Sequence, residues 1–364
     1  MATATTGIPY IDSLTVNNLG TQDLRELLWL EGLKYGALKE ILTLEFGVKD
    51  GEFIPWHGDM SAVGLPSNGC SPVWKSTPIA AGEKKWALGA YDIAETLCYK
   101  DLDNTVAQWA RHTGTQKGDL TDTAYMSEIV HPTLTKAMQE MLWRLVWFGD
   151  LGADNIANGG IITAGINPEL FKITDGLFKR LATLASGGQL KRVTIAANQQ
   201  TTYATQKTGI ETAGVAMSIF DEIIDGAPVT LSQKSNKVLL ATRALVMALR
   251  RDIKRNPPYS DLQWTAIFSG FPNVESIVYN GMQIIALPEW DKMIQSYENT
   301  GTAWNKPYRA IYADKSSLMA GFESDGELTY LETWFEKKEQ KNYIIAKDAL
   351  GTQTLDDENI VYAF

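Results

Sequence analysis

The chain has 364 residues, of which 45% are hydrophobic and 21% charged, and its 43 Asp and Glu outnumber 33 Lys and Arg to give a net charge of -10. This composition excludes a disordered chain and predicts one large core or two to three smaller ones, while the acidic balance argues against broad binding to nucleic-acid phosphates. No apolar run approaches the roughly 20 residues of a membrane span, and residues 1–10 lack the features of a signal peptide, so we expect a soluble protein made in a cytoplasm.

The N-terminal part of the chain begins without a regular pattern. Residues 1–20 show no periodicity and are expected to form an extended arm. Residues 22–46 follow an amphipathic helical pattern that Gly32 and Gly36 interrupt. We therefore expect two short helices or one bent helix after the arm.

An irregular segment rich in glycine and proline follows at residues 47–82, and it nevertheless contains Phe53, Trp56 and Trp74. A long apolar loop is unfavourable in water, so we expect another subunit to cover it. The loose alternation of residues 84–99, which include Trp86, predicts a strand that returns from this loop.

The longest helical pattern covers residues 121–148, where apolar side chains recur at three- and four-residue steps. Pro132 suits a first helical turn, and Gly149 offers a stop. The face away from the leucines carries Trp143 and Trp147, so we expect this helix to pack on more than one side, against other elements or a neighbouring subunit.

The middle of the chain alternates helices with polar segments. Helical patterns cover residues 168–185 and 213–224, and Gly226 stops the second. Between them, the Thr- and Gln-rich residues 189–209 read as a strand edge or a surface loop.

Short strands and turns dominate the rest of the chain. Thr242 is expected to cap a helix over 244–254, and Asn280-Gly281 is expected to form a tight turn between two extended pieces within 277–287. A short helix is predicted from Pro288 to Ile294. Strands are predicted over 238–241, 309–313, 317–322, 328–337 and 342–349, and the apolar end 360–364 is expected to join a sheet.

The order and spacing of these elements resemble those of the HK97-fold major capsid proteins of tailed bacteriophages. The resemblance covers residues 120–364 and rests on 237–241 (KVLLA), 278–290 (VYNGMQIIALPEW), 309–314 (RAIYAD), 318–321 (LMAG), and the helix of 137–148 with the loop GDLGAD that follows it. It implies an α+β fold with an N-terminal arm, an extended two-stranded E-loop, a P domain with a spine helix and a long antiparallel sheet, and an A domain.

The resemblance also implies a division of this chain. Residues 1–46 would form the arm and first helices, 47–99 the E-loop region, 100–210 the P domain with its spine at 121–148, 211–325 the A domain, and 326–364 the C-terminal P-domain strands. The leucine face of the spine would then pack on the sheet of residues 328–364.

The function implied is that of a coat protein that self-assembles into hexamers and pentamers of an icosahedral head around double-stranded DNA, without sequence-specific DNA binding, inside the host bacterium. Residues 1–21 lack the charged helical character of a cleavable scaffolding segment. The resemblance therefore implies a separate scaffolding protein or a chain that is already processed, together with a portal and possible decoration proteins. An encapsulin-like compartment of the same fold, enclosing a cargo enzyme, is the alternative.

Candidate contact residues come from the apolar loop, the spine and the strands of the resemblance. Some relatives form an isopeptide cross-link between an E-loop lysine and a P-domain asparagine, and Lys84 or Lys85 with Asn342 resembles that pair. Ordinary solvated side chains are the interpretation we prefer for these three residues. The candidate interface set is Phe53, Trp56, Trp74, Lys84, Lys85, Trp86, Trp143, Trp147 and Asn342.

Catalytic and metal chemistry has little support in the sequence. Cys70 and Cys98 lie too far apart for a CxxC motif, and the three histidines offer only His57-Gly58-Asp59 as a pairing with a carboxylate. Asp150 and Asp154 supply far fewer oxygens than Ca²⁺ takes, so we expect them to cap a helix end. We expect no cofactor and no catalytic activity; a ligand-binding enzyme using the glycine loops at 149–160 or 187–188 is the remaining alternative.

Overall fold

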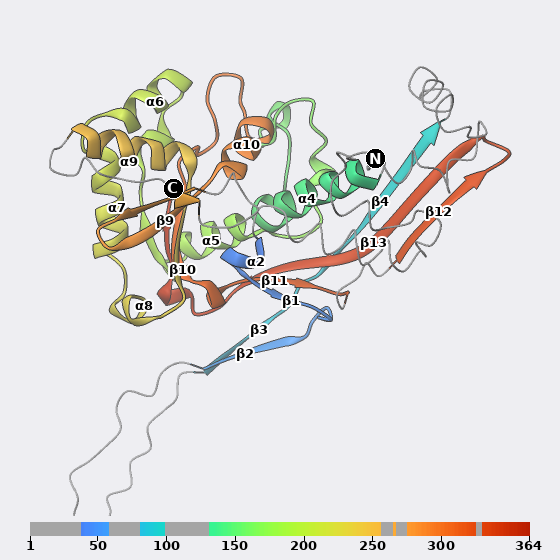
Figure 1. The fold of residues 1–364 in the computed structure, drawn as a ribbon, viewed down its shortest axis with the longest axis horizontal. Coiled ribbons are helices and arrows are strands. Elements are labelled where there is room, and N and C mark those ends of the chain that lie inside the picture. Colours follow the sequence, from blue (N-terminus) through green and yellow to red (C-terminus); the bar gives the residue numbers. More distant parts are fainter. Residues whose placement is uncertain (1–37, 58–80, 99–130, 256–264, 267–274, 325–329) are drawn as a thin grey trace, which may run out of the picture.

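The computed structural model describes residues 38–57, 81–98, 131–255, 265–266, 275–324 and 330–364. The expected arm, most of the expected first helices, Trp74 and the first ten residues of the expected spine helix lie outside these ranges. The described residues form a rounded body of helices around one sheet, a second sheet that extends away from it, and a two-stranded hairpin that projects from the side (Figure 1).

The extended sheet is built around one long strand, β13. On one side β13 pairs antiparallel with β11 and β12, and on the other it pairs with β4 from Leu350 and Gly89 to Lys341 and Cys98. The short strand β1 adds to β11 in parallel. The strands of this five-stranded sheet are β1 (Thr43–Glu45), β4 (Gly89–Cys98), β11 (Leu318–Phe322), β12 (Tyr330–Glu336) and β13 (Lys341–Thr354).

The sheet of the body has seven strands in the order β5-β14-β10-β6-β9-β8-β7. The pairs β6–β9 and β14–β5 are parallel, and the other neighbours are antiparallel. Its strands are β5 (Lys191–Val193), β6 (Lys237–Thr242), β7 (Thr265–Ala266), β8 (Glu275–Tyr279), β9 (Met282–Leu287), β10 (Ala310–Asp314) and β14 (Val361–Ala363).

Helices cover both sheets. The α-helices described are α2 (Leu38–Ile41), α4 (His131–Phe148), α5 (Leu177–Ser186), α6 (Tyr203–Glu211), α7 (Val215–Asp225), α8 (Val229–Gln233), α9 (Arg243–Arg255) and α10 (Pro288–Tyr297). The 3-10 helices are η5 (Ile156–Asn158), η6 (Pro168–Leu170), η7 (Ala196–Gln199), η8 (Lys315–Ser317) and η9 (Asp357–Asn359). Within the described ranges, none of these helices has both the length and the apolar character needed to cross a membrane.

The body sheet separates two hydrophobic cores because successive side chains of a strand point to opposite faces. On β10, Ile311 and Ala313 join the core with α4, α5 and α10, whereas Ala310 and Tyr312 join the core with α7 and α9. The same alternation holds for β6, β9 and β14. A strand buried on both faces carries few polar residues, which explains why these short strands read as continuous apolar runs.

The predicted spine helix is confirmed where the structure describes it, as α4. Pro132 lies in its first turn, and the helix ends one residue before Gly149. Its leucine face shares a core with Ile344 and Ala346 of β13, as predicted, and α5 packs beside it (Figure 1). The last two turns are buried on nearly all sides, which confirms packing on more than one face.

Other local predictions also hold. Asn280 and Gly281 have φ values of 48° and 76°, the positive values that a tight hairpin turn requires, between β8 and β9. Helix α10 begins at Pro288 and runs three residues past the predicted end. Gly226 follows α7 directly.

Five predictions about elements were wrong. Residues 43–45, within the segment predicted as the first helices, form the strand β1. The segment predicted as strand edge or loop contains α6, and the helix predicted from residue 168 begins only at Leu177, after η6. The cap of α9 is the Asp291 carboxylate, which accepts hydrogen bonds from Arg243 N and Ala244 N at 2.7 and 3.0 Å; Thr242 Oγ1 instead accepts from Arg309 N. Strand β14 joins the body sheet and not the sheet of β12 and β13.

Candidate assembly sites

The projecting hairpin pairs β2 (Phe53–His57) with β3 (Ala81–Lys85) in antiparallel register, from Phe53 opposite Lys85 to His57 opposite Ala81. Figure 1 shows it leaving the body beside the end of the extended sheet. Phe53 is 49% exposed, and the Lys85 Nζ lies 4.4 Å from the centre of its ring. The hairpin therefore offers an aromatic and a cationic group to its surroundings.

A small separate core anchors the base of this hairpin. It contains the buried side chains of Val48, Ile54, Trp86 and Met319. The Trp86 ring packs so closely on β11 that a Cβ added to Gly321 would come within 2.9 Å of it. Only glycine leaves room for this approach.

Polar contacts join the same base to the end of β13. The Lys84 Nζ lies 2.6 Å from both Asp357 carboxylate oxygens and 3.3 Å from Thr354 Oγ1. The Gln353 amide donates to the Lys85 carbonyl at 2.8 Å. Side-chain exposures of 30% for Lys84 and 16% for Asp357 leave this ion pair partly shielded from water, which strengthens it relative to a fully exposed pair.

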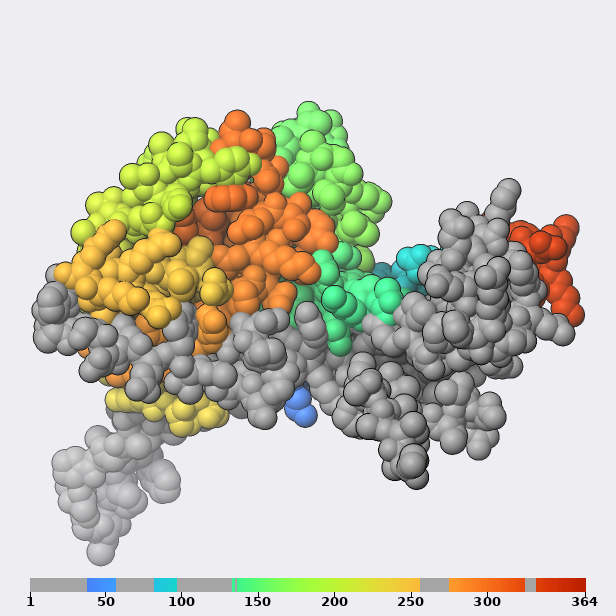
Figure 2. All heavy atoms as spheres, turned by 45° about the horizontal axis from the view of Figure 1, so that its top comes forward, coloured from blue at the N-terminus to red at the C-terminus, as the bar shows by residue number. Residues whose placement is uncertain are grey.

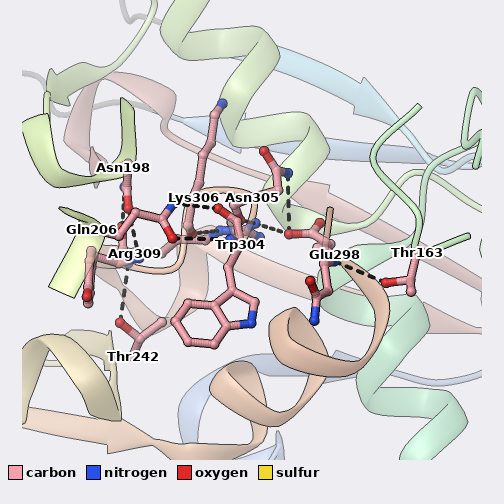
Figure 3. A network of polar contacts seen from close by, with 11 residues as sticks. Thr163, Asn198, Gln206, Thr242, Glu298, Trp304, Asn305, Lys306 and Arg309 are labelled. Atoms are coloured by element: carbon pink, nitrogen blue, oxygen red, sulfur yellow. Dashed lines mark hydrogen bonds and ion pairs between the residues drawn. The ribbon is translucent and has the colours of Figure 1, made fainter. Parts of the chain in front are cut away.

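A second group of polar contacts lies inside the body, where α10 ends and β10 begins (Figure 3). Arg309 is 3% exposed and forms an ion pair with buried Glu298, the residue that follows α10. Its other guanidinium bonds go to the carbonyls of Asn305 and Lys306, both at 2.9 Å. A buried charge requires such complete pairing, because desolvation of an unpaired ion costs several kcal/mol.

The Arg309 guanidinium also ties the end of α4 to the start of α5. It lies 5.3 Å from the ring centre of Phe148, the last residue of α4, and 4.7 Å from that of Phe178 on α5. Both distances are in the range of cation–π attraction. One side chain thus joins the spine helix, the following helix and the body sheet.

Two side-chain amides hold the loop before β10 in the same region (Figure 3). Gln206 of α6 bonds both backbone groups of Trp304, at 2.7 and 3.1 Å. Asn198 of η7 bonds both backbone groups of Tyr308, at 2.6 and 3.0 Å. Each amide acts as a strand neighbour would, so the loop is fixed without belonging to a sheet.

The tryptophans expected at interfaces lie mostly inside this chain. Trp147 is fully buried, with its ring centre 5.5 Å from that of Phe178 and 4.7 Å from that of Trp290, and Trp143 is 1% exposed. We expected Trp143 and Trp147 to contact either other elements of this chain or a neighbouring subunit, and the structure shows contacts with other elements of this chain. Trp86 at 3% exposure is likewise a core residue, which corrects its placement among surface contacts.

Of the three residues that resemble a cross-link pair, only Lys85 is a well-exposed side chain as preferred from the sequence, because Asn342 is buried and Lys84 is only partly exposed. Asn342 is 2% exposed within the extended sheet, opposite Phe335 of β12, and Lys84 is engaged by Asp357. Burial removes the Asn342 amide from an approaching lysine, so we drop it from the exposed contact set. Phe53, Lys85 and half-buried Trp56 keep the exposure that an interface residue needs.

The two aspartates of the glycine loop bond to nearby protein groups. Asp150 accepts from Gly152 N at 2.8 Å and pairs with Lys179, while Asp154 accepts from Asn155 N at 2.8 Å next to η5. The expected capping role was wrong, because the N-cap of η5 is Asn155, whose side chain accepts from Asn158 N at 3.1 Å. Among the described residues, no group of three or more His, Cys, Asp or Glu is placed to hold a metal ion.

Sequence reasoning missed both polar groups described above. Lys84 and Asp357 are 273 positions apart, and no local pattern links them. Arg309 carried a weak signal, since it is a charged residue at the start of an apolar strand. Thr202, which caps α6 by accepting from Thr205 N at 3.2 Å, shows the spacing of a capping box with threonine in place of glutamate.

Comparison with known proteins identifies the class of fold through a solved structure. No family model matches the sequence, and no curated protein does. A chain of the solved structure described as "Satellite phage P4 procapsid including size determination (Sid) protein" aligns over 98% of this chain and 94% of its own, with a TM-score of 0.53 and 12% identity. The protein therefore has the α+β fold of a phage capsid protein, and the HK97-like fold class predicted from the sequence is confirmed.

Two further solved structures are similar to this chain to a lesser degree. A chain of "Gordonia phage Cozz" has a TM-score of 0.47 at 11% identity, over 90% of this chain and 85% of its own. A chain of "Capsid of native GTA particle computed with C5 symmetry" has a TM-score of 0.45 at 10% identity, over 90% of this chain and 89% of its own.

Proposed function

We propose that this protein is the major capsid protein of a tailed bacteriophage, which self-assembles into the hexamers and pentamers of an icosahedral head that encloses double-stranded DNA. The supporting observation is the alignment with a phage procapsid structure over nearly the full length of both chains. A fold shared over nearly the full length of both chains favours a shell subunit over a different function built on part of that fold.

The shape of the subunit agrees with this function. A hairpin that projects from the body with Phe53 exposed has no partner strand among the described residues except its own second strand, and a shell places such a segment against a neighbouring copy. Figure 2 shows α6 and α9 at one end of the molecule and the β12–β13 turn at the other. An elongated subunit of this kind can contact several neighbours at once, and repeated contacts make assembly cooperative.

The net charge of -10 suits a container for DNA, because an acidic subunit does not adhere to the packaged phosphates. We infer that the principal partner is the chain itself. A scaffolding protein, a portal and decoration proteins are further proposed partners, and the assembled head in the host bacterial cytoplasm, then the virion, is the proposed location.

Electron microscopy of the purified protein, expressed with and without its neighbouring genes, tests the proposal. Closed icosahedral shells are expected, and shells recovered from infected cells should contain double-stranded DNA. Shells that contain a protein cargo and no DNA would support the encapsulin-like compartment instead. A protein that never forms shells but shows a ligand-dependent thermal shift in a small-molecule screen would contradict a capsid role.

A further inference from the structure

An apolar contact and an ion pair both hold the base of the projecting hairpin to the body: the core around Trp86 and the pair of Lys84 with Asp357. We propose that the Lys84–Asp357 ion pair is a latch that holds the β2–β3 hairpin in its projecting position in the unassembled subunit. The latch itself follows from the contacts of one chain. Only its consequence in a particle rests on the proposed function.

The Trp86 core supplies a pivot for this latch. Trp86 follows β3 directly and packs closely against Gly321 of β11, in a core that is separate from the two large ones. Apolar packing of one ring against a strand fixes the position of the hairpin but resists its rotation weakly, because dispersion contacts are not directional. A second, directional contact is needed to define the angle of the hairpin.

Lys84 supplies that directional contact at the adjacent position. Its Nζ contacts both carboxylate oxygens of Asp357 at 2.6 Å, and Asp357 is itself held by the Thr354 hydroxyl, which donates to Oδ1 at 2.9 Å. Asp357 is the first residue of η9 and follows the end of the long strand β13, at Thr354, by three positions. A swing of the hairpin about Trp86 would separate the two charges without breaking the pairing of β2 with β3.

The neighbouring lysine shows that this contact is particular to Lys84. Lys85 is exposed, and its Nζ lies over the Phe53 ring on the hairpin itself. Among the described residues of the body, none forms an ion pair with Lys85. The Lys85 carbonyl, in contrast, accepts from Gln353 beside the latch. The side chain of Lys84 and the backbone carbonyl of Lys85 therefore together hold β3 to the residues at the end of β13.

Hydrogen exchange of the subunit under conditions that prevent assembly tests the latch. The reporters are the side-chain amide protons of Gln353, which donates to the Lys85 carbonyl at 2.8 Å and so joins β3 to the end of β13. Lys84→Met keeps the aliphatic stem and removes the charge. We expect exchange of the Gln353 side-chain amide to become about fivefold faster, the size expected for a partly shielded ion pair.

Matched variants separate the latch from general effects. Lys85→Met removes the neighbouring charge, and Lys179→Met breaks a comparable lysine–aspartate pair, at 3.1 Å, on the body. Both should leave exchange of the Gln353 side-chain amide unchanged, while Asp357→Asn should reproduce the effect of Lys84→Met. Exchange in Lys84→Met equal to that of the wild type, or raised evenly over the whole chain, would overturn the latch.

A second measurement addresses the particle. If the hairpin angle is set before assembly, Lys84→Met shells should have a broader distribution of diameters than wild-type shells in electron micrographs. Identical distributions, with faster exchange, would overturn the role of the latch in assembly. A wild-type protein that forms no shells would contradict the proposed function and leave the exchange result valid.

Discussion

A single residue, Arg309, connects more parts of the body than any local pattern suggests. Its guanidinium pairs with Glu298, bonds two loop carbonyls and lies against Phe148 and Phe178. A charged group can be buried this deeply only when its hydrogen bonds and its counter-ion are all supplied by the protein. The stability of this junction therefore depends on both partners being present.

Arg309→Met tests that dependence. The change leaves the Glu298 carboxylate buried without its counter-ion, which we expect to lower the free energy of unfolding by about 3–5 kcal/mol. Urea unfolding of the unassembled protein measures the change. Lys172→Met, which breaks an exposed pair with Glu169, is the control and should cost less than about 1 kcal/mol. Equal losses of unfolding free energy in the two variants would show that the buried pair contributes no more to stability than the exposed pair.

Asp291 makes folding stability depend on pH. Burial raises the pKa of its carboxyl from the ordinary 3.8 to about 6, although the hydrogen bonds from Arg243 N and Ala244 N act in the opposite direction. Because the folded state holds this proton more tightly than the unfolded state, the group stabilises the fold most below pH 3.8. That contribution, about 3 kcal/mol, is lost as the pH rises to about 6.

Asp291→Asn keeps an oxygen that can cap α9 and removes the titration. We expect the free energy of unfolding of the variant to depend less steeply on pH between 4 and 6 than that of the wild type, by up to about 3 kcal/mol over this interval. Unfolding midpoints in denaturant, measured at several pH values, give the two slopes. Parallel slopes would show that Asp291 keeps its ordinary pKa in the folded state.

At the scale of elements, two glycines set the meeting point of α4 and α5. Gly149 follows α4 and Gly176 precedes α5, and the Gly176 N–H donates to the Gly149 carbonyl at 2.8 Å. A Cβ on Gly176 would lie 2.7 Å from Gly149 N and 2.9 Å from Leu145 O. The rigid backbone on both sides cannot move away from an added methyl group, so the spine and the next helix pack at a fixed distance.

Gly176→Ala should therefore destabilise the protein, by about 1–3 kcal/mol or more, through overpacking against backbone atoms. Gly187→Ala, at the other end of the same helix, is the matched control. Its Cβ would meet nothing closer than 3.5 Å, and its φ of -80° suits alanine, so we expect no loss and a gain of up to about 1 kcal/mol. Thermal unfolding compares the two, and similar melting temperatures would contradict close packing at this junction.

At the scale of the whole molecule, the division into a body and projecting parts determines which surfaces meet other copies. Side chains of both large cores are already buried in one chain, so contacts between chains must come from exposed groups. Among the described residues of the hairpin, Phe53 is the large apolar group with the greatest exposure. Because about half of this side chain is already covered in the free subunit, its burial at an interface contributes about 1 kcal/mol per copy.

Phe53→Ser should thus reduce the yield of shells while leaving the stability of the isolated subunit within about 0.5 kcal/mol of the wild type. Sedimentation and electron microscopy measure assembly, and urea unfolding measures stability. Val278→Ser, which alters a 58% exposed apolar residue on β8 in the body, is the comparison. Full assembly of Phe53→Ser would remove the hairpin from the proposed contacts.

Local patterns predicted much of the fold because their causes lie within a few residues. The 3.6-residue period of α4, the positive φ at Asn280 and Gly281, and the proline at the start of α10 each depend on neighbours along the chain. Helix α6 escaped prediction because its buried residues, Gln206 and Ile210, include a polar one whose role appears only when the backbone of Trp304 is beside it.

The sequence alone determined the net acidic charge, helices α4 and α7, the turn between β8 and β9 and the start of α10, because periodicity and turn chemistry act locally. The class of fold came from the resemblance to the HK97-fold capsid proteins, which the order and spacing of the elements carry. Only the tertiary structure decided that β14 joins the body sheet, that Trp143 and Trp147 lie in the core, and which partners Lys84 and Arg309 take. The physical reason is distance along the chain. Pairing between strands and between charges joins segments hundreds of residues apart, and it is selected by packing of the whole molecule.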